Sequence, residues 1–141
     1  MKYVCDAQQH TWFRLETEGE AAAESKAMAH AVEKYFRQAW EAAVRSYEPA
    51  KTLSSFERNI GLKDHIQRVM PLFLTLRDRD GKPLVTAMLP PLGKEDRVFK
   101  PIVVGPDNTD PYPAYGEAIK TLGNHLGLSL DPARCFPYRR V

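Results

Sequence analysis

The segment between Pro71 and Pro90 constrains the fold of this chain more than any other part of the sequence. Its eighteen residues, LFLTLRDRDGKPLVTAML, contain an Asp80-Gly81 pair that is typical of a two-residue type I′ turn. Folding the segment about that pair brings six aliphatic residues onto one face, and a slip of one residue would expose all of them. We therefore expect a β-hairpin in which Leu72, Leu74 and Leu76 lie opposite Leu89, Ala87 and Val85.

The other face of the same hairpin is cationic near its turn. Residues 49–100 contain ten basic and six acidic side chains, although the whole chain has a net charge of only +2. Such a face can bind a polyanion, or it can keep the hairpin from pairing edge to edge with other sheets. We favour the second interpretation, and the candidates for the first are Phe73, Arg77, Arg79 and Lys82.

Further strands are predicted at residues 2–6, 11–16 and 100–104. The first two are separated by a short polar stretch, which favours a second hairpin. Alternation along the second strand directs Phe13 and Leu15 to the core and Trp12 and Arg14 to the opposite face. There, the aromatic ring beside a cation predicts a surface stack, or else the start of a binding patch.

A long helix is predicted from Glu18 to Glu48. It begins with a capping box formed by Thr17 and Glu20, is rich in alanine and ends before Pro49. A helix of about 45 Å is longer than a domain of this size easily covers. We expect either that the helix bends or breaks near residues 19–25, or that its apolar stripe contacts a second chain through Met28, Val32, Tyr35, Phe36, Trp40 and Tyr47.

The rest of the chain predicts shorter helices and an extended end. Ser54 and Glu57 form a second capping-box motif before one broken or two short helices that stop at Pro71. A further helix is expected from Asp110 to Gly127, followed by an extended tail over residues 131–141. Since 141 residues suit one core, we predict a single α+β domain over residues 1–141: an antiparallel sheet of about five strands, with one long and one shorter helix packed on one face.

The sequence contains little that indicates catalysis. It lacks glycine-rich phosphate-binding motifs, and its four histidines have no second ligand at helical spacing. Cys5 and Cys135 are too far apart in sequence to form a local redox or zinc motif, so we expect two buried thiols. We therefore predict no metal site and no cofactor, and the absence of a local catalytic constellation argues against an enzyme.

Three functional hypotheses follow. The leading one is a small, soluble, non-catalytic binding or regulatory protein that forms homo-oligomers through the stripe of the long helix. No apolar run is long enough to span a membrane and no secretion signal is evident, so a cytoplasmic location is expected. The second is binding of single-stranded nucleic acid on the cationic hairpin face. The third is a small-molecule-binding protein or enzyme whose pocket lies between the long helix and the sheet, using Tyr35, Trp40, Arg14 or His65.

Overall fold

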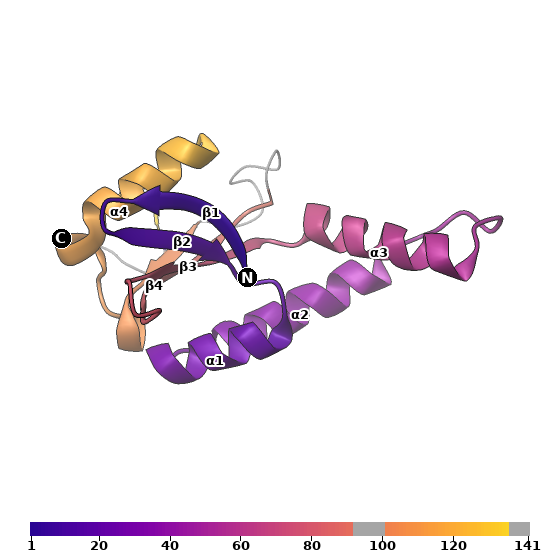
Figure 1. Ribbon diagram of the computed structural model, residues 1–141, viewed down its shortest axis with the longest axis horizontal. Coiled ribbons are helices and arrows are strands. Elements are labelled where there is room, and N and C mark those ends of the chain that lie inside the picture. Colours follow the sequence, from indigo (N-terminus) through magenta and orange to yellow (C-terminus); the bar gives the residue numbers. More distant parts are fainter. Residues whose placement is uncertain (92–100, 136–141) are drawn as a thin grey trace.

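The computed structural model describes residues 1–91 and 101–135 and has an α+β fold (Figure 1). Five strands form one antiparallel sheet in the order β1-β2-β3-β4-β5, which confirms the predicted fold class. The elements in chain order are β1 (Lys2–Ala7), β2 (His10–Arg14), α1 (Glu18–Met28), α2 (Val32–Arg45), α3 (Ser55–Val69), β3 (Leu72–Arg77), β4 (Pro83–Leu89), β5 (Ile102–Val104), the short 3₁₀ helix η2 (Pro106–Asn108) and α4 (Tyr112–Leu126).

The β3–β4 hairpin has the predicted register from Leu72↔Leu89 to Leu76↔Val85. Its turn differs from the predicted type I′ turn, because only Gly81 has a positive φ there, at 80°. The Asp78 carboxylate accepts hydrogen bonds from the amides of Asp80 and Lys82, which stabilises a longer turn. The pairing consequently shifts beyond Leu76.

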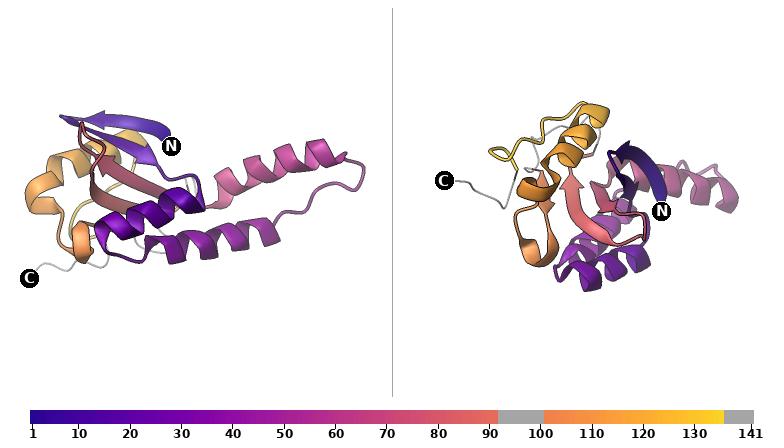
Figure 2. Two further views of the ribbon diagram at one scale, coloured as in Figure 1. Left: turned by 60° about the horizontal axis from the view of Figure 1, so that its bottom comes forward. Right: turned by 60° about the vertical axis from the view of Figure 1, so that its left-hand side comes forward.

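Both faces of the sheet are covered by helices, on opposite sides. The aliphatic face of the hairpin packs under α4 in one core cluster, whose α4 members are Ala118, Ile119 and Leu122. The other face packs against α1, α2 and α3 in a second cluster that includes Phe36 and Phe73. The sequence predicts that the helices pack on one face of the sheet, and this part of the prediction is wrong. The sheet lies between two helical layers (Figure 2).

The predicted long helix is two helices. Ala29 ends α1 in the left-handed conformation (φ 53°), and α2 begins at Val32 and ends at Arg45. Ser25 stabilises the break, since its carbonyl accepts from the amide of His30 and its hydroxyl accepts from the amide of Glu33. The break lies at residues 29–31, outside the region 19–25 where a break was considered. It lets α1 lie on the sheet while α2 continues past its end.

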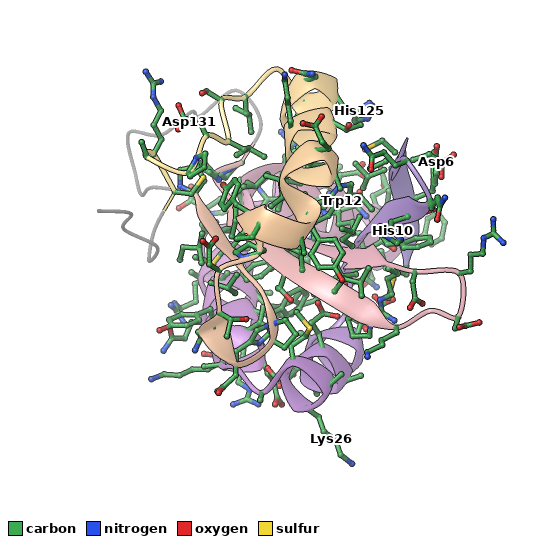
Figure 3. All side chains as sticks on the ribbon, turned by 90° about the vertical axis from the view of Figure 1, so that its left-hand side faces the viewer. Asp6, His10, Trp12, Lys26, His125 and Asp131 are labelled. Carbon is green, nitrogen blue, oxygen red and sulfur yellow. The ribbon has the colours of Figure 1, made fainter. Side chains whose placement is uncertain are left out.

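The first hairpin and α4 enclose Trp12, contrary to the predicted surface position. Trp12 is fully buried, and its Nε1 donates to the backbone carbonyl of Ala118 in α4 at 3.0 Å (Figure 3). The pairing of β2 with β3 places Trp12 opposite Leu76, on the face that α4 covers, while Phe13, which was predicted to be in the core, is only partly buried. Cys5 and Cys135 are both buried in the same cluster, as expected. Of the predicted tail, residues 136–141 lie outside the described part of the chain.

The chain passes from β2 to its sheet neighbour β3 through all three helices α1–α3. As a result, the end of α2 and most of α3 project beyond the sheet, side by side, in both views (Figures 1 and 2). In the described residues, no helix combines the length and the apolar character required to cross a bilayer.

Candidate functional site

The projecting part of the molecule, residues 40–65, is here called the arm. It comprises the second half of α2, the connection to α3, and α3 as far as His65. Only Ala43 is buried among these residues, whereas Trp40 and Val44 are each 39% exposed, Ile60 47% and Phe56 74%. A two-helix unit with so little buried surface gains little stability from its own packing.

The exposed apolar residues of the arm lie along two stripes. On α3, the apolar stripe consists of Phe56 and Ile60, which are one turn apart. The polar residues Lys63 and Gln67 continue the same helix face, in further steps of three and four residues. On α2, Trp40 and Val44 are one turn apart. Because Trp40, Lys63 and Gln67 line the same cavity, the two stripes border a common surface.

The helices of the arm contact each other through polar and aromatic groups near their middle. The hydroxyl of Ser46 donates to the carbonyl of Ala43 and also lies 2.7 Å from Nε2 of His65. When the single hydroxyl proton is directed to the carbonyl, His65 is the donor in the second hydrogen bond. This arrangement is the reverse of a catalytic dyad, in which histidine accepts the proton of the nucleophile.

The predicted interface residues fall into two groups. Met28, Val32 and Phe36 are buried inside the molecule, where Val32 and Phe36 belong to the cluster beneath the sheet. Tyr35 and Trp40 are exposed, and Tyr47 is partly buried with its ring against His65. The stripe is thus real, but its first half covers the sheet of the same chain. The arm residues Phe56 and Ile60 were not among the sequence candidates, although their spacing of four was visible.

A cavity of about 360 Å³ lies where the base of the arm meets the end of β2. It lies between the helices and the sheet, where the third hypothesis placed a pocket, and it includes two of the four residues named for that pocket, Arg14 and Trp40. Its walls are largely apolar, and four of its polar lining side chains are Arg14, Glu16, Lys63 and Gln67. The apolar lining residues are Leu15, Phe36, Trp40, Ile66, Met70 and Pro71.

Arg14 is the most unusual group of this cavity. Its side chain is half-buried, and Nη2 donates to the backbone carbonyl of Gln67 at 3.1 Å. Within residues 1–91 and 101–135 it forms no ion pair. Burial lowers the pKa of the guanidinium, and the charge of Glu16 only partly opposes that effect. The guanidinium is therefore partly desolvated, its hydrogen bond to Gln67 is open to solvent, and no carboxylate of the described residues forms an ion pair with it.

A buried polar network joins α1 to the sheet on the same side. Glu24 is fully buried, and its carboxylate accepts from Nη2 of Arg77 at 3.0 Å and from the hydroxyl of Thr86 at 2.5 Å. The Thr86 hydroxyl lies 2.9 Å from Nε2 of His30, so His30 donates to it. Burial lowers the pKa of His30, although the charge of Glu24 opposes this. The sequence suggests that the hairpin face with Arg77 and Thr86 is exposed to solvent. These polar side chains are instead hydrogen-bonded to the buried Glu24.

The four polyanion candidates are not on one exposed surface. Phe73 is buried against Phe36, and Arg77 is paired with Glu24. Arg79 and Lys82 remain exposed at the turn of the hairpin. The sequence could not reveal that α1 and α2 cover this face. Nucleic-acid binding stays a prediction that now depends on two side chains.

Other parts of the described structure offer less chemistry. A cavity of about 510 Å³ lies between α4 and residues 128–132, but its charged lining residues Glu117, Lys120 and Asp131 are all exposed to solvent. No group of three or more His, Cys, Asp or Glu in the described ranges is placed to hold a metal ion. Comparison with known proteins adds no function, because no family model, no curated protein and no solved structure matches this chain.

Proposed function

We propose that this chain is a non-catalytic binding protein that self-associates through its arm. The observation that carries the proposal is the concentration of exposed apolar side chains there: Trp40, Val44, Ile60 and Phe56 all belong to residues 40–65. Such a surface, on a segment that buries only Ala43, marks an interaction site. The proposal moves the contact from the start of the predicted stripe to its end and to α3.

A second copy of the same chain is the partner that suits the arm. Residues 40–65 carry four acidic and four basic side chains, so two arms do not repel each other by net charge. Two antiparallel helices are also half of a four-helix bundle, and a twofold axis through the apolar surface pairs each arm with its counterpart. This arrangement covers Phe56 and Ile60 in both copies at once.

The proposal is tested by measuring the mass of the chain in solution. We expect sedimentation or light scattering to show a dimer that dissociates on dilution through the micromolar range. In the double variant Phe56→Asp/Ile60→Asp, two charges in each arm oppose the contact, so a monomer is expected. Tyr3→Asp is the matched control, because Tyr3 is 58% exposed but lies on β1.

Two results would contradict the proposal. One is a wild-type mass equal to a single chain throughout the micromolar range. The other is a dimer that persists in the arm variant and is lost in the Tyr3 variant, which would place the contact on the sheet edge. Circular dichroism of both variants excludes unfolding as the cause, and both changes are at exposed positions.

A further inference from the structure

The cavity at the base of the arm combines apolar walls with an excess of positive charge. Leu15 and Ile66 are buried, and Trp40 lies at the border between the cavity and solvent. Its volume of about 360 Å³ is at the lower end of the range of roughly 300–1,000 Å³ found for small-molecule sites. A cavity of this kind excludes much of the water that would otherwise solvate a charge in its wall.

The guanidinium of Arg14 is partly buried and has no carboxylate partner within the described residues. A charged group taken out of water is costly unless it is paired and hydrogen-bonded. Arg14 has one hydrogen bond, to the carbonyl of Gln67, and a guanidinium has five N–H donors. Most of its donor capacity is therefore available to a molecule that enters the cavity.

The charges around the cavity indicate the kind of anion. Arg14 and Lys63 are cationic and Glu16 is anionic, which leaves one positive charge in the lining. A monoanion balances this charge, whereas a dianion would also be repelled by Glu16. A planar carboxylate matches the fork of a guanidinium by two parallel hydrogen bonds. The apolar walls require that the rest of the ligand be hydrocarbon.

We propose that this cavity is a binding site for a small monocarboxylate with an apolar tail. The carboxylate pairs with the guanidinium of Arg14, with Lys63 at the exposed side, and the tail lies against Trp40 and the buried walls. The site shares Trp40 with the apolar surface of the arm but includes neither Phe56 nor Ile60, so a chain in which those two residues are changed keeps the whole lining of the cavity.

Tryptophan fluorescence provides a direct assay with octanoate as the probe. Only two tryptophans are present, and Trp12 is buried under α4 on the opposite face of the sheet. We expect octanoate to change the emission of Trp40 in a saturable way. The change should be absent in Trp40→Phe, where Trp12 alone reports. Acetate, which has no tail, and 1-octanol, which has no charge, are both expected to bind at least about tenfold more weakly.

The matched variants are Arg14→Gln and Arg79→Gln. Loss of the charge-assisted hydrogen bonds in Arg14→Gln should weaken octanoate binding at least about tenfold. Arg79→Gln makes the same change on the exposed hairpin turn and should leave binding as in the wild type. Lys63→Gln, at an exposed position that the fold does not require, should weaken binding by a smaller factor and serves if Arg14→Gln fails to fold.

Equal affinity for octanoate and 1-octanol would overturn the proposal, because the cavity would then be only apolar. Equal affinity in Arg14→Gln and Arg79→Gln would overturn it as well. Performing the titration on Phe56→Asp/Ile60→Asp separates the two proposals: binding there with wild-type affinity supports the cavity site whether or not the wild type forms dimers.

Discussion

The sheet with its two helical layers can be compared with the arm. Each contains a helix that begins with the same kind of local sequence, but the two helices lie in different environments. Capping boxes start both α1 and α3, with Thr17–Glu20 in one and Ser54–Glu57 in the other. Helix α1 then packs on the sheet, whereas α3 buries only Ile66. The comparison teaches that capping and spacing determine where helices form, while long-range packing determines how firmly they are held.

The largest expected difference concerns the removal of apolar side chains from the two regions. Leu76 is fully buried between Val85 and α4, so Leu76→Ala should lower the free energy of unfolding by about 3 kcal/mol. Ile60→Ala, at a position that is 47% exposed, should change it by about 0.5 kcal/mol or less in the monomer. Denaturant unfolding below the concentration range of self-association measures both.

A large loss of stability in monomeric Ile60→Ala would contradict this difference between the buried sheet and the exposed arm. It would mean that the arm is supported by contacts of its own chain that its exposed surface does not suggest. A loss of stability that appears only at higher protein concentration would instead support this difference, because the missing contacts would then come from a second copy.

The sequence was sufficient for the strands because their period and turn are local signals. The register from Leu72 to Leu76 followed from an aliphatic face and an Asp-Gly pair. The coverage of both sheet faces was not visible, since Arg77 and the threonines of the other face look solvated. Arg77 and Thr86 are instead paired with Glu24, which is 53 residues from Arg77 in the chain, and Thr75 accepts a hydrogen bond from Arg77.

The position of the break between α1 and α2 could not be predicted for a related reason, whereas the pocket expected between helix and sheet matches the cavity in its general place and in Arg14 and Trp40. Residues 29–31 are Ala-His-Ala, and neither alanine nor histidine is a helix breaker. The break is held by Ser25, whose hydrogen bonds are local, and by the contact of His30 with Thr86, which requires the folded sheet. Arg14 was noticed as a cation beside an aromatic residue. Its actual partner, the carbonyl of Gln67, is 53 residues away.

A smaller effect is expected from pH at the break between α1 and α2, which lies against the sheet. Burial lowers the pKa of His30, whereas an unfolded histidine titrates near about 6.5. Between these two values the unfolded chain binds more protons, so stability should fall as the pH decreases from about 6.5 toward 5. His30→Gln keeps a donor for Thr86 and should remove that part of the decrease.

The control for this prediction is His125→Gln, which makes the same substitution at an exposed position near the end of α4. The capping carboxylates Glu20 and Glu57 have lowered pKa values, because backbone amides hydrogen-bond to them, and the terminal amine also binds Glu20. Their contribution is lost only in a separate window below about pH 4.5. Coincident stability profiles for wild type and His30→Gln would show that the titration of His30 does not affect stability.

The smallest effect on stability should come from the capping residues, because each region contains one helix that begins with a capping box. Thr17→Ala removes the cap of a helix packed on the sheet and should lower global stability by about 1 kcal/mol. Ser54→Ala removes the same kind of hydrogen bond, but the first turn of α3 can open while the sheet stays folded. In the monomeric variant it should therefore leave global stability unchanged and accelerate hydrogen exchange at residues 55–58.

In a dimer formed through the arm, the same Ser54→Ala change should act differently. The first turn of α3 carries Phe56 into the proposed contact, so fraying of that turn must be suppressed before two copies can pair. The cost of the lost cap should then appear as weaker dimerisation, by a few-fold, instead of faster exchange. If Ser54→Ala leaves the dimer dissociation constant unchanged while exchange in 55–58 increases, the start of α3 does not take part in the contact, and self-association must use Trp40, Val44 and Ile60.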